Sequence, residues 1–537
     1  MSGMLQSSLP QHLCALLEPQ AYPHPVREVQ LIETHISWVL LAGEFAYKVK
    51  RPVRYAFIDL RDPERRKFLC EEELRLNRRF APELYLEVSR ITSDEGRARI
   101  GGEGPVIEYA VRMRRFDGEH ALDRLLAHLQ VGPEELEALG RQLANIHAGL
   151  PAAPTGSAWG RPSAIQALLA RNLDECAEAA RVFGTEDAVG ALRSSLRESL
   201  SLATETMAAR RANGRIRECH GDLHSRNVVR LGTRLVPFDC LEYEPAFRWI
   251  DVADEVAFLA SDLCARDHPL HGHAFVSGYL AESGDYNACR LLRLYEAHRA
   301  LIRAKVAALS AKDSSGHSEL EELRAEHGKL VTLASRRLVR HAPTLLLVCG
   351  LSGSGKTWLA RQLAVRLLAV HVRSDVERKR HVGLHALARS RSGVAEGLYS
   401  SGASAQVYDD LARAAEDILA GGFTAIIDAT FLRREQRTRF AQLGGRSGAL
   451  VRLIYCEAPV YTLRARIAAR AVSGYDPSEA DESVLDWQLS HFELPRPEEP
   501  VESTRIRTAE PGALEKVLRA IREPLVSAAR TGSGGGA

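Results

Sequence analysis

The chain has 537 residues, which is too long for one hydrophobic core, so we expect two or three domains. Its composition, with 45% hydrophobic and 26% charged residues, is that of a soluble globular protein, and its formal net charge of +2 excludes a general attraction to nucleic acids or membranes. No C-x-x-C pair, secretory signal or apolar run of membrane-spanning length is present, so we expect a cytoplasmic protein with reduced thiols.

The first informative elements are a hairpin and the helix that follows it. Residues 31–50 alternate between apolar and polar side chains, which predicts two antiparallel strands. Lys48 and Lys50 lie two residues apart on the second strand, so their side chains point to the same face. A helix is predicted over residues 62–80, and the segment between residues 122 and 213 is predicted to be mainly helical.

A group of polar residues with a defined spacing follows this helical segment. His220-Gly221-Asp222 is followed by Asn227 and then by Asp239, with short apolar segments around them. The Asp–Asn spacing is that of the catalytic loop of protein kinases. Phosphoryl transfer needs a carboxylate that orients the substrate hydroxyl and accepts its proton, and oxygen ligands that hold Mg²⁺ on the triphosphate. We therefore assign the first role to Asp222 and metal binding to Asn227 and Asp239.

These residues resemble the aminoglycoside phosphotransferase and choline kinase branch of the kinase-like fold, and the resemblance covers residues 30–310. It implies that Lys48 contacts the α- and β-phosphates of ATP, with Lys50 as the alternative. It also implies that one glutamate of Glu71–Glu73 pairs with this lysine, and we prefer Glu73. The sequence departs from the kinase pattern in having only Gly43 in place of a G-x-G-x-x-G loop, and Asp-Cys-Leu in place of Asp-Phe-Gly.

Charged residues continue beyond this motif. Glu242, Arg248, Asp251 and Asp254 could line the pocket of a cationic substrate, or they could form buried ion pairs that fix the catalytic loop. A break and a charged helical segment follow, and we interpret residues 311–342 as a helical linker between domains.

The second half begins with an apolar strand, a glycine-rich loop and a predicted helix. The loop reads Gly350-Leu351-Ser352-Gly353-Ser354-Gly355-Lys356-Thr357, which has the G-x-x-x-x-G-K-[ST] spacing of the phosphate-binding loop. Glycines let backbone N–H groups surround phosphate oxygens, and the N-terminus of the helix favours the same anion. We expect Lys356 to reach the outer phosphates and Thr357 to hold Mg²⁺.

Two aspartates follow predicted strands of this half. Asp375 is our candidate base for the hydroxyl of the acceptor, because ligands bind at the carboxyl ends of parallel strands. Arg378 lies nearby to hold an anionic group, and Ser374 or Asp375 could also cap the next helix. Asp428 occupies a position like that of the Walker B aspartate, in which a carboxylate joins the Mg²⁺ shell.

Two arginines complete the candidate site. Arg466 and Arg470 share a helix face beside residues 472–482, a turn-rich segment that we interpret as a lid. Arginines in such a place can stabilise the charge that develops during phosphoryl transfer.

Residues 343–525 resemble small P-loop kinases of the gluconate kinase, polynucleotide kinase and zeta-toxin type. The resemblance implies ATP-dependent phosphorylation of a hydroxyl on a small molecule, sugar, nucleotide or nucleic-acid end, and the near-neutral charge counts against nucleic acid. We predict an α+β kinase-like (aminoglycoside phosphotransferase-like) domain over residues 1–310, an α/β P-loop NTPase domain with a parallel sheet over residues 343–530, and a flexible tail, 531–537. This order of domains resembles bacterial proteins described as bifunctional aminoglycoside phosphotransferase/ATP-binding proteins.

The function expected from these motifs is phosphotransfer from ATP, with Mg²⁺, to a small molecule that carries a hydroxyl group. Two alternatives follow from the same residues. In one, the N-terminal half is a binding or regulatory module without catalysis. In the other, the whole chain is a nucleotide-gated interaction protein that has no acceptor.

Overall fold

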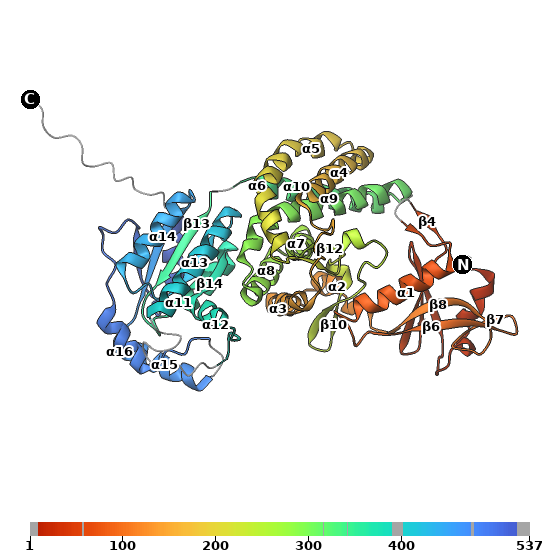
Figure 1. The fold of residues 1–537 in the computed structure, drawn as a ribbon, viewed down its shortest axis with the longest axis horizontal. Helices are drawn as coiled ribbons and strands as arrows, with labels where there is room; N and C mark the ends of the chain where they lie inside the picture. Colours follow the sequence, from red (N-terminus) through yellow and green to blue (C-terminus); the bar gives the residue numbers. More distant parts are fainter. Residues whose placement is uncertain are drawn as a thin grey trace, which may run out of the picture. The chain divides into compact units, whose positions relative to one another are not determined.

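A computed structural model describes residues 9–55, 58–314, 316–340, 342–388, 401–473 and 477–522. The chain divides into two units (Figure 1). The first unit comprises Met1–Tyr279 and Leu294–Leu338, and the second comprises Leu280–Arg293 and Val339–Ala537. The tail that we predict to be flexible, residues 531–537, lies outside the described residues.

The first unit contains a six-stranded antiparallel sheet with the strand order β1-β2-β3-β8-β6-β7. Its strands are β1 (Val29–Glu33), β2 (Ser37–Ala42), β3 (Phe45–Lys50), β6 (Tyr85–Asp94), β7 (Arg97–Ile100) and β8 (Val106–Arg114). The predicted hairpin is confirmed as β2 and β3, and the predicted helix is confirmed as α1 (Pro63–Asn77).

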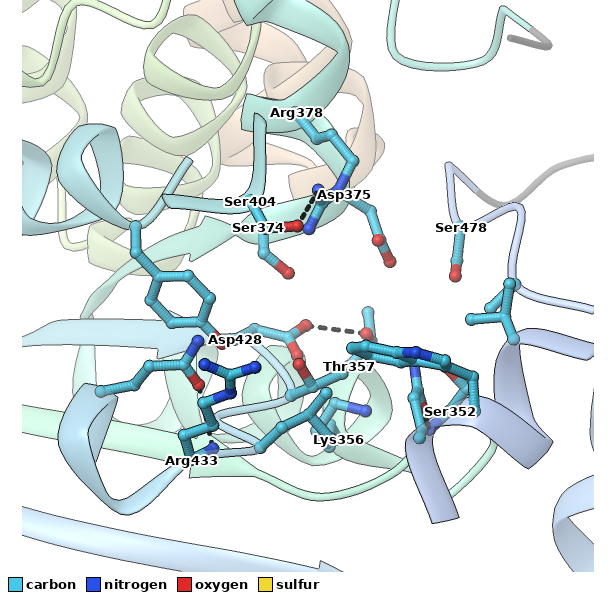
Figure 2. Close-up of a pocket in the computed structure, with 18 of the residues that line it drawn as sticks. Ser352, Lys356, Thr357, Ser374, Asp375, Arg378, Ser404, Asp428, Arg433 and Ser478 are labelled. Atoms are coloured by element: carbon cyan, nitrogen blue, oxygen red, sulfur yellow. Dashed lines mark hydrogen bonds between the residues drawn. The ribbon is translucent and has the colours of Figure 1, made fainter. Parts of the chain in front are cut away.

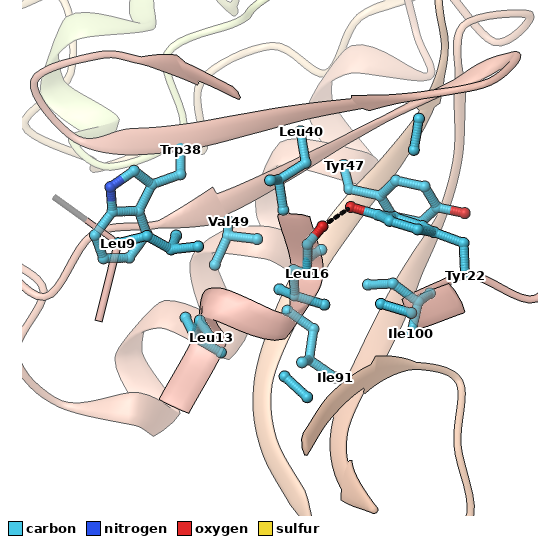
Figure 3. Packing of buried hydrophobic residues seen from close by; sticks show 14 residues of the cluster. Leu9, Leu13, Leu16, Tyr22, Trp38, Leu40, Tyr47, Val49, Ile91 and Ile100 are labelled. Carbon is cyan, nitrogen blue, oxygen red and sulfur yellow. Dashed lines mark hydrogen bonds between the residues drawn. The ribbon is translucent and has the colours of Figure 1, made fainter. Parts of the chain in front are cut away.

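The alternation of β3 assigns its side chains to two different cores. Tyr47 packs with Leu40 and with Leu16 of the 3-10 helix η1 (Gln11–Leu17), which covers one face of the sheet together with η2 (Pro19–Ala21) (Figure 3). Ala46 belongs to the core on the opposite face, where α1 packs. Lys48 and Lys50 have the same parity as Ala46, so the strand directs both lysines toward α1.

The rest of the first unit is mainly helical, as predicted. Its helices are α2 (Leu122–Ala127), α3 (Pro133–Gly149), α4 (Pro162–Ala180), α5 (Glu186–Gly190), α6 (Arg193–Ala212), α7 (Val252–Ala265), α8 (Pro269–Ser283), α9 (Cys289–Asp313) and α10 (His317–Leu338). The C-terminal end of α8 and the N-terminal end of α9 fall within Leu280–Arg293, which belongs to the second unit.

Three short antiparallel strand pairs complete this unit. They are β4 (Arg54–Tyr55) with β5 (Ile58–Asp59), β9 (Ile216–Glu218) with β12 (Trp249–Asp251), and β10 (Val228–Leu231) with β11 (Arg234–Pro237). The His220–Asn227 loop runs from β9 to β10, so both of its ends are fixed by strand pairing.

The division of the chain differs from our prediction in two places. The segment predicted as a linker contains α10, which belongs to the first unit and buries Leu330. Leu280–Arg293 belongs to the second unit, where the Tyr286 hydroxyl donates to Glu377 Oε1 at 2.9 Å. Tyr286 and Glu377 are 91 residues apart, and α10 contacts α6 and α7, so local sequence patterns do not reveal these contacts.

The second unit contains a five-stranded parallel sheet with the order β14-β15-β13-β16-β17, which confirms the predicted α/β fold. Its strands are β13 (Thr344–Cys349), β14 (Val370–Arg373), β15 (Ala425–Asp428), β16 (Leu450–Glu457) and β17 (Ser503–Arg507). Its helices are α11 (Lys356–Leu367), α12 (Ser374–His381), α13 (Ser401–Ala420), α14 (Arg434–Arg446), α15 (Val460–Ser473), α16 (Glu482–His491) and α17 (Ala513–Arg522).

Helices cover both faces of this sheet. Leu346 and Ile426 form a core with Leu359 of α11 and Val517 of α17, while α13 and α14 contact the sheet strands and each other. Burial on two faces explains the continuous apolar character of β13 and β15. Within the described part of the chain, no helix combines the length and the apolar character needed to cross a bilayer.

Candidate functional site

The phosphate-binding loop occupies the turn between β13 and α11. Gly350, Gly353 and Gly355 adopt φ angles of +140°, +81° and +89°, a region that favours glycine. A Cβ atom at Gly350 would lie 2.3 Å from the Cys456 carbonyl oxygen, and one at Gly355 would lie 2.4 Å from Thr508 Oγ1. The loop therefore needs glycine at these positions, and its backbone fits the cradle that a phosphate group requires.

The loop continues into two side chains with the chemistry of a Mg²⁺–phosphate site. Lys356 Nζ donates to the Leu351 carbonyl oxygen at 2.9 Å, which keeps the ammonium group at the loop. The Thr357 hydroxyl donates to Asp428 Oδ2 at 2.7 Å. Asp428 ends β15, which is paired with β13, so sheet pairing brings the two predicted metal-binding residues together.

The carboxylate of Asp428 is held in its ionised form. Burial by itself would raise its pKa, but the hydrogen bond from His371 and the charges of His371 and Lys356 outweigh burial and lower the pKa to about 2. His371 Nε2 lies 3.3 Å from the Oδ2 atom that also accepts from Thr357. A hydroxyl oxygen and an ionised carboxylate are the hard ligands that Mg²⁺ prefers, so the two residues fit this ion.

A cavity of about 1050 Å³ joins the phosphate-binding loop to the predicted acceptor residues (Figure 2). Lys356 and Thr357 line it together with Ser374, Asp375 and Arg378 of α12. Figure 2 shows Asp375 facing the same open space as Thr357 and Asp428. The structure thus places the predicted base in the cavity that contains the phosphate-binding residues.

The alternative role of Ser374 or Asp375 as a helix cap is not observed. Helix α12 begins at Ser374, and Arg373 occupies the capping position without a side-chain cap. The side chain of Asp375 is partly exposed to the cavity rather than bound to the first turn of its helix.

Both predicted arginines of α15 also line the cavity. Arg466 Nη1 donates to the Gly353 carbonyl oxygen at 3.1 Å and to Thr508 Oγ1 at 3.3 Å. Arg470 Nη2 donates to the Ala480 carbonyl oxygen at 2.7 Å. The lid that we predict over residues 472–482 lies partly outside the described residues, so it stays a prediction.

Sequence reasoning missed several residues of this cavity. Gln488 of α16 accepts from the Ser352 N–H at 2.9 Å, and Trp358 and Trp487 add aromatic surface. Arg433 also lines the cavity and follows a turn in which Phe431 has a φ of +47°. The position of Asp428 at the end of a predicted strand indicates that a turn follows. No local pattern indicates which side chains of this turn reach the cavity.

The first unit contains a second group of predicted catalytic residues. Asn227 Nδ2 donates to the Asp222 carbonyl oxygen at 3.0 Å and to Asp222 Oδ2 at 3.2 Å. His220 Nε2 lies 2.8 Å from the Phe238 carbonyl oxygen, next to Asp239. These contacts bring the predicted base and the predicted metal-binding segment to one place.

The carboxylate of Asp222 is also held in its ionised form. Burial would raise the pKa of Asp222, but the electrostatic interaction and hydrogen bond with His224, together with the interactions with His220 and Arg303, outweigh burial and lower this pKa. The His224 ring lies 3.5 Å from Asp222 Oδ2, although we assigned no role to it from the sequence.

Both lysines of β3 contact the same glutamate of α1. Lys48 Nζ lies 2.8 Å from Glu73 Oε1 and 2.5 Å from Asp239 Oδ1. Lys50 Nζ lies 2.5 Å from Glu73 Oε2 and 2.5 Å from Glu242 Oε1. Burial would raise the pKa of Glu73, but the two lysines lower it to about 2. Of the three glutamates considered, Glu73 is thus the one that meets the lysines, and only Lys48 also meets the predicted metal ligand.

The four charged residues after Asp239 form buried ion pairs, which was one of our two interpretations. Glu242 pairs with Lys50, and Arg248 pairs with Glu218 at 3.1 Å. Asp251 pairs with Arg210 at 2.8 Å, and Asp254 pairs with Arg299 at 2.7 Å. Because their charges are compensated within the protein, they are not arranged as the pocket of a cationic substrate.

Comparison with known proteins gives a family match for each unit. Residues 46–292 match the model of a family described as the phosphotransferase enzyme family, and residues 345–495 match a model described as an AAA domain. Over 477 residues the chain is 29% identical to an uncharacterized protein of Mycobacterium tuberculosis, a match that covers 87% of this chain and 93% of that protein.

Two solved structures are similar to one part of the chain each. A putative kinase from Chloroflexus aurantiacus is 23% identical, covers 34% of this chain and 98% of its own, and has a TM-score of 0.28. A choline kinase from Cryptosporidium parvum is 12% identical, covers 59% of this chain and 93% of its own, and has a TM-score of 0.35.

Proposed function

From its two kinase-family domains, one of the phosphotransferase enzyme family and one an AAA domain of the P-loop kinase type, we propose that the chain transfers phosphate from ATP to a hydroxyl group of a small molecule. The observation that carries this proposal is the single cavity lined by Lys356, Thr357, Asp428, Asp375 and Arg378. A phosphate donor site and a carboxylate for the acceptor hydroxyl must share one space for direct transfer.

In the second unit, the backbone of the phosphate-binding loop and Lys356 bind the triphosphate. Thr357 and Asp428 hold Mg²⁺, which when bound supplies positive charge beside the phosphates. Arg466 and Arg470 stabilise the charge that develops on the transferred group. This assignment is supported by the position of all five side chains on the wall of the same cavity.

The acceptor binds on the α12 side of the cavity in this proposal. Asp375 accepts the proton of the acceptor hydroxyl as its oxygen attacks the γ-phosphorus, and the bond to the leaving ADP oxygen breaks. Arg378, one turn further along α12, holds an anionic group of the acceptor. The acceptor is then a hydroxylated small molecule rather than a nucleic-acid end, in keeping with the net charge of +2.

We propose a second phosphotransfer site in the first unit, which would make the protein bifunctional. Asp222 acts as the base, Asn227 and Asp239 hold Mg²⁺, and Lys48 contacts the α- and β-phosphates of ATP. The ion pairs of Lys48 with Glu73 and Asp239 support this assignment. A cytoplasmic location, where Mg·ATP is present, is part of the proposal.

Transfer of labelled phosphate tests the proposal and separates it from its alternatives. Wild type, Asp222→Asn and Lys356→Ala are incubated in parallel with Mg·ATP labelled at the γ-phosphate and a fractionated pool of cytosolic metabolites. Loss of a different labelled product in each variant would identify two enzymes on one chain. Loss in Lys356→Ala alone would make the first unit a binding or regulatory module.

A wild type that binds ATP but labels no compound in the pool would overturn the proposal. The nucleotide-gated interaction protein would then be the better account of the chain.

A further inference from the structure

Two lysine–carboxylate pairs lie side by side between β3 and the segment after the catalytic loop. Lys48 joins Glu73 to Asp239, and Lys50 joins Glu73 to Glu242. We propose that Lys50 and Glu242 form a positioning pair, which holds Glu73 and the Asp239 segment in place when Lys48 and Asp239 separate to bind nucleotide and metal. This inference rests on the proposed phosphotransfer site of the first unit.

The two pairs differ in their access to a ligand. The side chains of Lys50 and Glu73 are fully buried, and that of Glu242 is 4% exposed. Lys48 is 13% exposed, and Asp239 is 42% exposed. A phosphate or a metal ion can therefore reach Lys48 and Asp239, whereas the ion pairs of Lys50 with Glu73 and Glu242 are closed to solvent.

The backbone of Asp239 shows why this segment needs support. Asp239 adopts a φ of +64°, which a residue with a side chain keeps only when its surroundings fix it. Its N–H donates to the Tyr85 hydroxyl at 3.1 Å, and the Cys240 N–H donates to Asn77 Oδ1 at 2.9 Å. The Leu241 N–H donates to the His220 carbonyl oxygen at 3.0 Å.

Glu242 completes this series through its side chain. Its carboxylate accepts from Lys50 Nζ at 2.5 Å, and its carbonyl oxygen accepts from Arg248 Nη1 at 3.0 Å. Each of the four residues from Asp239 to Glu242 is thus fixed by at least one hydrogen bond. When Lys48 leaves Asp239, the Lys50 and Tyr85 contacts still tie the segment to the sheet.

The Lys50–Glu242 pair also maintains the charge balance around Glu73 while nucleotide binds. When Lys48 turns from Asp239 to a phosphate group, part of the positive charge beside Glu73 moves away. A buried carboxylate without a cation is costly, and Lys50 still supplies one within the cluster. Lys50 therefore lets Glu73 stay ionised and in place in both states, so Lys48 can exchange partners without displacing α1.

The test removes the pair without leaving an uncompensated charge. Lys50→Met/Glu242→Met replaces both buried groups by apolar side chains, which the fold tolerates better than loss of one partner. The matched control is Lys305→Met/Glu175→Met, which removes a partly exposed lysine–glutamate pair of the same unit, 2.7 Å apart. All proteins are full-length and carry Lys356→Ala/Thr357→Ala, so that the phosphate-binding loop does not contribute to binding.

The measurement is ATP binding by calorimetry over a series of Mg²⁺ concentrations, with thermal unfolding of each variant. We expect the Lys50/Glu242 variant to unfold at a temperature close to that of its parent. We also expect it to need about tenfold more Mg²⁺ for half-maximal ATP binding. Loss of residues that hold a metal ligand in place typically weakens metal affinity by about tenfold or more. The control pair leaves the Mg²⁺ requirement unchanged, and Asp239→Asn abolishes the Mg²⁺-dependent binding.

Two results would contradict the inference, and they are distinguishable. If the parent protein does not bind Mg·ATP, the proposed function of the first unit is wrong and the inference falls with it. If the parent binds and the Lys50/Glu242 variant shows the same Mg²⁺ requirement, the pair is only structural. A second variant, Glu242→Gln, keeps an oxygen that accepts from Lys50, and we expect it to retain the Mg²⁺ requirement of the parent.

Discussion

Thr357 and Asp428 are 71 residues apart in the sequence, and the hydroxyl of the first donates to the carboxylate of the second at 2.7 Å. The contact follows from the sheet, because β13 leads into the phosphate-binding loop and its neighbour β15 ends at Asp428. The same strand ends open onto the cavity that contains Asp375. In the proposed function, this arrangement brings the Mg·ATP site and the carboxylate for the acceptor hydroxyl together in one space.

Removal of the Asp428 carboxylate tests the metal-binding role in the second unit. We expect Asp428→Asn to lower phosphate transfer at this site by about 100-fold or more, because stabilisation of phosphoryl charge is lost. Steady-state transfer at saturating Mg·ATP measures the effect. Asp486→Asn is the control, since Asp486 pairs with Arg464 on an exposed surface at 2.5 Å. Equal activity of the two variants would rule out the role of Asp428.

Asp375 is predicted to act on the acceptor and not on ATP. Asp375→Asn should therefore lower the transfer rate by about 10²- to 10⁴-fold, which is the usual contribution of a general base, while ATP affinity stays within a factor of two or so. Transfer kinetics and calorimetric titration with Mg·ATP separate the two effects. Asp486→Asn, which removes the exposed ion pair with Arg464, again serves as the control. A loss of ATP affinity as large as the loss of transfer rate would instead place Asp375 in the nucleotide site.

The close approach of Thr508 makes Gly355 sensitive to substitution. Gly355→Ala adds a Cβ atom 2.4 Å from Thr508 Oγ1, whereas Gly448→Ala adds one in open space at a similar positive φ. The unfavourable φ costs each variant about 1–2 kcal/mol, and we expect a larger loss of unfolding free energy in Gly355→Ala. Urea unfolding gives the comparison. Equal losses would mean that the loop can move away from Thr508.

The ionisation of Asp428 predicts a specific dependence of stability on pH. Its pKa is lowered from 3.8 to about 2, so the folded state binds its proton less readily than the unfolded state does. The resulting stabilisation, about 2 kcal/mol, is complete above the unfolded pKa and is lost as the pH falls from about 4 to about 2. Urea unfolding between pH 6 and pH 2.5 should show a steeper decrease for wild type than for Asp428→Asn. Parallel decreases would contradict the lowered pKa.

The sequence predicted those parts of the two sites that depend on local spacing. The phosphate-binding loop, the Asp222–Asn227 pair and the strand-end Asp428 are all defined by neighbours in the chain, and their structural positions follow from one strand or one loop. The spacing of the sequence could not decide whether Lys48 or Lys50 contacts the phosphates of ATP, because both lie on the same face of β3. The difference between them lies in Asp239 and Glu242, which are 191 and 192 residues away from their respective lysines.

The remaining features depend on contacts that no local pattern contains. Leu280–Arg293 packs within the second unit through residues such as Tyr286, although the sequence around it continues the helices of the first. Gln488 reaches the Ser352 N–H from a helix 136 residues further along. Arg433 lines the cavity two residues after Phe431, whose positive φ is unusual for a residue with a side chain.

The ratio of phosphorylated product to ADP distinguishes phosphate transfer from simple hydrolysis of ATP. ADP formation and phosphorylated product are measured together, with Mg·ATP and a metabolite pool, for wild type and for Lys356→Ala/Asp222→Asn. We expect wild type to form one phosphorylated product molecule for each ADP, and the double variant to form neither. Formation of ADP with inorganic phosphate alone would show that the chain hydrolyses ATP without an acceptor, and phosphotransfer to a small molecule would be ruled out.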